Sequence, residues 1–149
     1  MKQRLRVSTI RYCTFLILMM SLACHPKNSR TLIFPTDGVW SVSWIETGIE
    51  LRKGQTVVIS AVGSVRPSTG ADIYAGPDGT TEVQSWQDSY SYRSDFPHEA
   101  VIARIGGGDI LLIGSGQQFQ TQTGGTLEIG VNDTDPCNNE GSFEIEICW

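Results

Sequence analysis

Short runs of alternating apolar and polar residues, separated by glycine-containing turns, dominate the chain. The clearest runs are residues 126–131 and 142–147, in which every second side chain is apolar. This alternation is typical of β-strands that bury one face and expose the other to water. No segment shows a sustained period of 3.6 residues, and all 16 glycines follow residue 23. The pattern therefore predicts an all-β fold, an antiparallel sandwich or barrel.

Further strands are predicted upstream of this pair. In the first, Trp40, Val42 and Trp44 share one face. Ile49 and Leu51 continue the pattern of this first strand, and further strands are expected at residues 57–65, 71–75, 100–105 and 110–113. Residues 80–97 show no period, and a loop of this length in a compact domain is usually functional or disordered.

The first 23 residues have the composition of an export leader. Four basic residues accompany an apolar run at 13–23, which is shorter than the roughly 20 residues that a membrane span requires. Ser21 and Ala23 suit cleavage before Cys24, and the ending Leu-Ala-Cys resembles a bacterial lipoprotein signal. The sequence predicts a lipoprotein-type signal peptide at 1–23, lipidation of Cys24 and a cell-envelope location. Simple secretion or a periplasmic location is the alternative.

The mature chain is predicted to be one acidic domain on a short tether. Residues 24–36 are assigned to the tether and residues 37–149 to the domain. From Cys24 onward, 7 Lys and Arg stand against 16 Asp and Glu, a net charge of −9. Such a domain repels phosphate backbones, which argues against nucleic acid as a partner. Membrane contact is expected only through a lipid on Cys24.

A loop rich in side-chain oxygens, residues 132–141, lies between the last two strands. Asp133, Asp135, Asn138 and Asn139 supply at least four such oxygens within seven residues. Calcium takes six to eight oxygens at about 2.3–2.6 Å, so the loop suits part of a calcium shell. The flanking strands predict that these oxygens lie at the solvent-exposed tip of a hairpin. An ordinary turn stabilised by local hydrogen bonds of Asn and Asp is the open alternative.

Two cysteines remain after the leader and Cys24. Cys148 lies six residues along the last strand from Ser142, roughly 20 Å, whereas Cys137 lies in the loop at the other end. A disulfide requires Cα atoms within about 7 Å. The spacing therefore predicts that Cys137 and Cys148 do not pair, and that both are free or intermolecular thiols.

Candidate catalytic groups are sparse. His98 is the only imidazole outside the tether, and Ser91, Asp95 and Glu99 lie near it in the sequence. Nearness within a loop does not define a catalytic triad. The glycines at 106–108 precede neither Lys-Ser nor a helical pattern, so they indicate a turn rather than a phosphate cradle. A non-enzymatic domain is predicted, with a small periplasmic enzyme as a remote alternative.

Several motifs occur in the order found in one family. They are Gly-Gln-Thr-Val at 54–57, Gly-Pro-Asp-Gly at 76–79, Ala-Val-Ile-Ala-Arg-Ile-Gly at 100–106, Gly-Val-Asn-Asp at 130–133 and Asn-Asn-Glu-Gly-Ser-Phe at 138–143. From Trp40 to Trp149 the chain resembles the PA-IL-like (LecA-like) galactophilic lectins of bacteria. The resemblance implies a jelly-roll-like β-sandwich in which a calcium ion bridges the protein and sugar hydroxyls.

The resemblance also implies a ligand set. The side chains of Asp133, Asn138 and Asn139 would hold the ion, with backbone carbonyls of Cys137 and Arg66 completing the shell. The expected carbohydrate contacts are Asp133, Thr134 and Asn138.

The chain departs from the family at two places that bear on sugar recognition. The spacing from Asp133 to the Asn pair is shorter than in the galactose binders. No counterpart of their sugar-contacting His and Gln follows Gly79.

These observations predict a calcium-dependent carbohydrate-binding domain, with galactose-type glycans among the candidate ligands rather than a specified one. The alternative is a structural or adhesive β-sandwich that binds no sugar. A homo-oligomer is left open.

Overall fold

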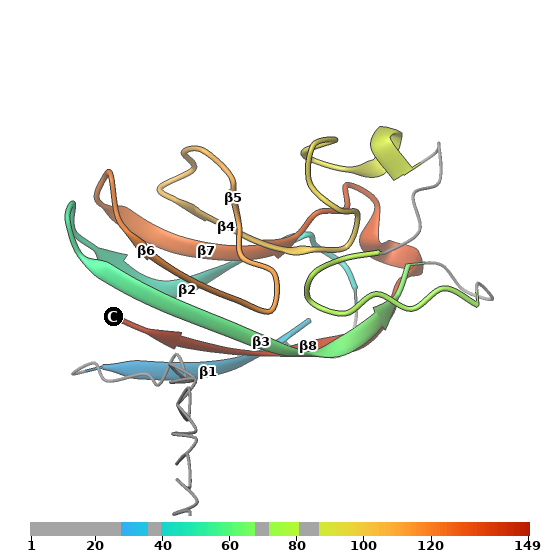
Figure 1. The fold of residues 1–149 in the computed structure, drawn as a ribbon, viewed down its shortest axis with the longest axis horizontal. Helices are drawn as coiled ribbons and strands as arrows, with labels where there is room; N and C mark the ends of the chain where they lie inside the picture. The colour runs from blue at the N-terminus through green and yellow to red at the C-terminus, as the bar shows by residue number, and fades with distance from the viewer. Residues whose placement is uncertain (1–27, 36–39, 68–71, 81–86) are drawn as a thin grey trace, which may run out of the picture.

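The protein is a sandwich of two antiparallel four-stranded sheets (Figure 1). The computed structural model describes residues 28–35, 40–67, 72–80 and 87–149. Within these ranges the only helical elements are two short 3₁₀ turns, η1 (Gln87–Tyr90) and η2 (Pro136–Asn138). No helix in the described ranges is long and apolar enough to cross a membrane. The prediction of an all-β sandwich is confirmed.

Each sheet combines strands from both halves of the chain. The first sheet has the order β1-β8-β3-β6, formed by β1 (Ser29–Phe34), β8 (Glu140–Cys148), β3 (Thr56–Arg66) and β6 (Gly116–Gln120). The second has the order β2-β7-β4-β5, formed by β2 (Trp44–Leu51), β7 (Gly125–Val131), β4 (Val101–Ile105) and β5 (Leu111–Leu112). Because sequential strands often lie in opposite sheets, several loops cross from one layer to the other.

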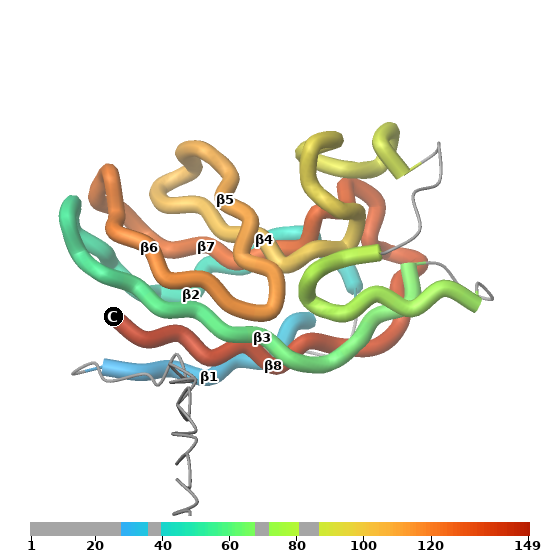
Figure 2. Tube along the Cα trace, viewed as in Figure 1, coloured from blue at the N-terminus to red at the C-terminus, as the bar shows by residue number. Residues whose placement is uncertain are grey.

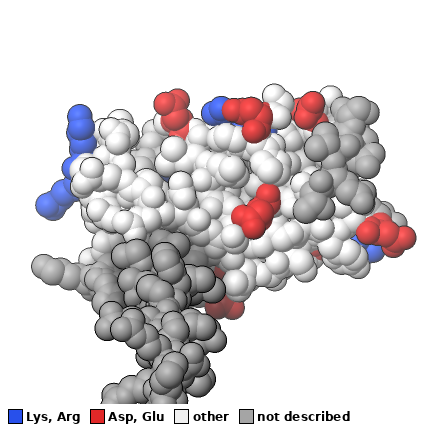
Figure 3. Space-filling view, viewed as in Figure 1, with Lys and Arg blue, Asp and Glu red and all other residues white. Residues whose placement is uncertain are grey.

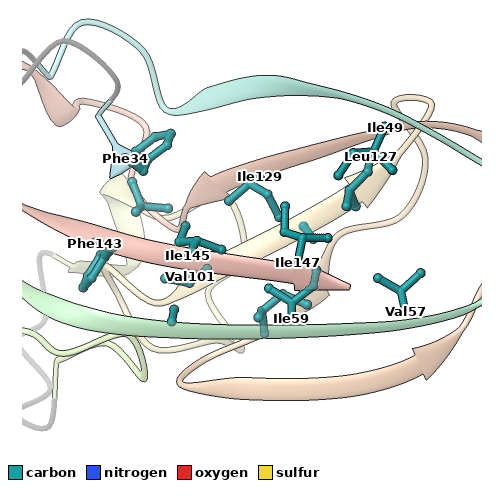
Figure 4. Close-up of a cluster of buried hydrophobic side chains, with 14 of the residues drawn as sticks. Phe34, Ile49, Val57, Ile59, Val101, Leu127, Ile129, Phe143, Ile145 and Ile147 are labelled. Carbon is teal, nitrogen blue, oxygen red and sulfur yellow. The ribbon is translucent and has the colours of Figure 1, made fainter. Parts of the chain in front are cut away.

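The core lies between the two sheets (Figure 4). Ile59, Ile145 and Ile147 from the first sheet belong to the same buried cluster as Leu127 and Ile129 from the second. These residues alternate with exposed or half-buried ones along their strands, as the sequence pattern requires. Full burial of each such side chain contributes about 1.5–3 kcal/mol to folding.

The assignment of residues 24–36 to a tether was wrong for its second half. Residues 29–34 form β1, which pairs with β8 from Ser29 opposite Cys148 to Phe34 opposite Phe143. The strand is hard to recognise because an edge strand can expose most of its side chains, and here only Phe34 is fully buried. Phe34 also packs edge-to-face on Trp40, with ring centroids 5.2 Å apart. The described fold therefore begins at β1.

The first predicted strand forms, but it begins later than expected. β2 begins at Trp44, and Val42, expected on the buried face, is 50% exposed. Trp40 is nevertheless buried, and its indole N–H donates to the carbonyl of Gly141 at 3.0 Å. This hydrogen bond fastens the segment before β2 to the start of β8.

Two further differences concern short strands. In its described part, the strand expected at 71–75 is reduced to a bridge between Ala75 and Val65. Conversely, β6 was not predicted, because its Gln-rich sequence lacks the apolar alternation of a core strand. In its described part, the long loop at 80–97 contains η1 but no strand.

The oxygen-rich loop is a crossover between sheets, which corrects the predicted hairpin. It leaves β7 in one sheet and enters β8 in the other. A hairpin tip would expose its side chains, whereas this crossover closes one end of the sandwich. As a result Asp133 is only 2% exposed and Asn139 only 7%.

The cysteines follow the prediction in part. Cys137 is exposed and free, and it does not pair with Cys148. The expectation of a free thiol at Cys148 was wrong, because this buried residue is disulfide-bonded. Its partner lies outside the described residues.

Candidate functional site

Asn132 joins two segments at one end of the sandwich. Its Oδ1 accepts the backbone N–H of Arg93 at 2.9 Å. Its Nδ2 lies 2.9 Å from the Arg93 carbonyl oxygen and 3.1 Å from those of Phe96 and Pro97. Because Asn132 is completely buried, these contacts replace bonds to water. Figure 2 shows the segment after η1 and the β7–β8 loop at the same end of the molecule.

The pairing of β4 with β7 continues past Val101 and Val131, and it brings a buried polar cluster together beneath the crossover loop. The amide nitrogen of Asn139 donates to Glu99 Oε1 at 2.9 Å and to Asp133 Oδ2 at 3.0 Å. His98 Nε2 lies 3.8 Å from Glu99 Oε1. One ligand-type atom from each of His98, Glu99 and Asp133 lies within 4.8 Å of the other two. We call His98, Glu99, Asp133 and Asn139 the inner cluster.

Burial and like charge dominate the electrostatics of the inner cluster. Burial, followed by the charge of Asp133 and a hydrogen bond with it, raises the pKa of Glu99 to about 9. Burial also lowers the pKa of His98, against the opposing effect of the Asp133 charge. Both shifts favour neutral groups at pH 7 in the metal-free protein. A bound cation would reverse this preference by stabilising the carboxylates.

The donor chemistry of the inner cluster fits a hard divalent cation. Glu99 Oε2 and Asn139 Oδ1 are both buried without a hydrogen-bond partner. Two ligands of one calcium ion can be at most about 4.6–5.2 Å apart, twice the usual calcium–oxygen distance. The carboxylate oxygens of Glu99 and Asp133 lie within 4.8 Å of each other, inside that limit, whereas His98 offers only a nitrogen. Carboxylate and amide oxygens are the groups that calcium prefers.

The structure separates the residues expected from the resemblance into two layers. Asp133 and Asn139 are buried in the inner cluster, whereas Thr134, Cys137 and Asn138 are exposed on the same loop. Thr134 is held by its backbone N–H, which donates to the carbonyl of Tyr90 at 2.7 Å.

Arg66 lies at the end of β3, next to the site region. Its guanidinium forms an ion pair with Glu140. In the register between β3 and β8, Arg66 lies opposite Glu140, one position from Asn139. The register thus places the Arg66 backbone beside the segment that carries Asn139.

Sequence reasoning did not identify His98, Glu99 or Asn132 as members of a binding site. The sequence feature that could have indicated it is the titratable dipeptide His98-Glu99, which lies shortly before a buried strand. It was considered only for catalysis, because nothing in the sequence shows that this pair folds against the loop after β7.

A polar hollow of about 230 Å³ lies beside the inner cluster, on the side of η1. Thr80, Ser91 and His98 are among its lining residues. Ser91 Oγ donates to the carbonyl of Gln87 at 2.8 Å and lies 3.0 Å from His98 Nδ1. His98 therefore connects the hollow with the two buried carboxyl groups.

Comparison with known proteins relates this architecture to a lectin. No protein-family model matches the chain, and no curated protein shows significant similarity to it. Among solved structures, the N-terminal domain of EclA, a PllA-like lectin, matches with a TM-score of 0.60 at 20% identity. The match covers 80% of this chain and 93% of that one. The chain has the fold of a PllA-like lectin domain. The resemblance to PA-IL-like lectins is thus confirmed at the level of the fold.

Replacing Asn132 by alanine should destabilise the protein and release the segment that carries His98 and Glu99. Each backbone group left buried without a partner costs about 1–3 kcal/mol. Urea unfolding in the presence of a chelator would measure the loss. Thr134→Ala, at an exposed position of the same loop, should change stability by no more than about 0.5 kcal/mol. Equal stability of the two variants would contradict the role assigned to Asn132.

Proposed function

We propose that this protein is a calcium-dependent carbohydrate-binding domain. The observation that carries the proposal is the convergence of Asp133 and Asn139 beneath a crossover loop, with unpartnered buried oxygens beside them. The lectin fold of the EclA domain supports the same function. A bound cation would stabilise these two adjacent carboxyl groups in their ionised form, which burial disfavours in its absence.

In this proposal the buried residues of the loop bind the ion and the exposed residues bind the sugar. Asp133 and Asn139 would hold the ion from below, together with the carbonyl of Arg66. Thr134 and Asn138, which are exposed on the same loop, would contact a sugar from the solvent side. When bound, calcium supplies open coordination positions for two neighbouring sugar hydroxyls. The fixed carboxylate and amide groups then select hydroxyl stereochemistry through directed hydrogen bonds.

Charged side chains on the surface support a neutral rather than a polyanionic ligand. Acidic residues are spread over the face shown in Figure 3. Arg66, Arg93 and Arg104 each form an ion pair with a carboxylate, which reduces their attraction for phosphate. Nucleic acid is therefore not an expected partner. We assign no catalytic role to the domain.

Glycan-array binding of the full-length protein, with calcium and again with a chelator, tests the proposal. Galactose-terminated glycans are the first probes, and the expected signal requires calcium. Calcium-induced thermal stabilisation without any glycan signal would favour the alternative of an adhesive or structural sandwich. Glycan binding that persists in chelator would refute the calcium requirement.

We also propose export and lipid attachment at Cys24, which intact mass spectrometry of the membrane fraction can test. The expected product begins at an acylated Cys24. Lipidation of Cys24 and the disulfide at Cys148 are competing outcomes. With Cys137 free, a chain cleaved before Cys24 and acylated there has no intramolecular partner left for Cys148. A peptide in which unmodified Cys24 is disulfide-linked to Cys148 would refute lipidation.

A further inference from the structure

Glu99 occupies a position that is unfavourable for a glutamate in two respects. Its side chain is completely buried at the start of the second sheet, directly before β4. Its backbone φ is 63°, and it is the only non-glycine residue with a positive φ among the described residues. Such a conformation costs on the order of 1–3 kcal/mol and persists where the surroundings enforce it, commonly at functional sites.

The groups around Glu99 do not supply a cation. Its carboxyl group faces Asp133, the amide of Asn139 and the imidazole of His98. No lysine or arginine in the described part of the chain forms an ion pair with it. Asn139 donates to Oε1, but Oε2 is buried without a partner. Two adjacent buried carboxylates require a positive charge to be stable in ionised form.

We propose that Glu99 is a direct ligand of the cation, so that the centre holds two carboxylates, Glu99 and Asp133. The inference rests on the proposed function for the ion, and it adds a ligand that the lectin resemblance does not supply. The set implied by the resemblance, Asp133 with two asparagines, carries one negative charge. Adding Glu99 gives two, which neutralises a divalent ion in a buried centre.

Asn139 can complete this centre by a simple rotation. Its amide nitrogen now lies 2.9 Å from Glu99 Oε1 and 3.0 Å from Asp133 Oδ2. A half-turn of the amide places Oδ1, at present unpartnered, on the side facing the carboxylates. Oxygens of Asp133 and Asn139, from the β7–β8 loop, and of Glu99, from the segment before β4, would then surround one position. Calcium is the expected ion because all three donors are oxygens.

Calcium titration of the full-length protein and two Glu99 variants tests the inference. Glu99→Gln preserves the side-chain shape and removes the charge, and it should weaken calcium binding at least about tenfold. The thermal shift produced by a fixed calcium concentration should fall accordingly. Asp135→Asn is the matched control, because it removes an exposed carboxylate from the same loop and should leave the affinity within about twofold.

Glu99→Gly separates a metal ligand from a structural residue. Glycine adopts positive φ without strain, so the metal-free variant should melt above the wild type while binding calcium at least about tenfold more weakly. A purely structural Glu99 would instead give a variant that melts lower and binds calcium normally. This variant also keeps the test decisive if Glu99→Gln fails to fold.

The outcomes distinguish this inference from the proposed function. If the wild-type protein binds no calcium, the proposed function fails. If the wild type binds calcium and both Glu99 variants bind it equally well, only the inference about Glu99 is overturned. Stronger stabilisation by zinc than by calcium would overturn the assignment to a hard cation, since His98 offers the nitrogen ligand that zinc accepts.

Discussion

Replacement of Asp133 by alanine is expected to abolish calcium-dependent glycan binding. Asp133 is 2% exposed and contributes Oδ2 to the hydrogen bond with Asn139. Loss of a carboxylate ligand should weaken calcium binding by about a hundredfold or more, since removing even an outer partner of a metal ligand typically costs 10–100-fold. Isothermal titration with calcium, followed by glycan binding at saturating calcium, would measure both effects.

Asp135→Ala provides the control for this experiment. Asp135 lies two residues further along the same loop, but its side chain is exposed. Its backbone N–H, which donates to Asp133 Oδ1 at 2.8 Å, is unchanged by the substitution. Near-normal affinity is expected for this variant. If Asp133→Ala retains both calcium and glycan binding, the site has been assigned to the wrong loop.

Replacement of Phe34 by alanine is expected to destabilise the protein by about 3–5 kcal/mol. Phe34 is completely buried, lies opposite Phe143 in the β1–β8 ladder and packs edge-to-face on Trp40. Domains of this size are stable by only about 5–15 kcal/mol, so much of the folding free energy would be lost. Equilibrium unfolding in guanidinium chloride, followed by tryptophan fluorescence, would measure the change.

Ile33→Ala tests whether this loss reflects burial or merely membership in β1. Ile33 is adjacent on the same strand but 46% exposed, so its truncation should cost less than about 1 kcal/mol. A small effect at both positions would mean that β1 is not an integral part of the sandwich.

Alternating apolar residues were sufficient to predict the central strands. The pattern of Ile59, Ile145 and Ile147 is visible in the sequence because each strand buries one face against a single core. Edge strands lack this constraint. β1 and β6 therefore escaped prediction, since one exposes most of its residues and the other is rich in glutamine.

The chemistry of the candidate site was only half visible in the sequence. Asp133 and Asn139 are conspicuous because they lie in a run of oxygen-bearing residues. Glu99 is 34 residues earlier and stands in a loop whose local sequence gives no sign of its partner. Asn132, which holds that loop in place, resembles any turn-forming asparagine until its contacts with Arg93, Phe96 and Pro97 are seen.

By itself, the sequence determined an acidic β-sandwich with an oxygen-rich loop before its last strand. Both properties arise from local composition and periodicity, which require no knowledge of distant neighbours. Only the tertiary structure decided that this loop crosses between sheets, rather than turning within one. Glu99 lies beside Asp133 because the antiparallel pairing of β4 with β7 continues past Val101 and Val131, and Asn139, beyond the crossover, contacts both carboxyl groups. The number of carboxylates available to an ion is thus a property of the fold.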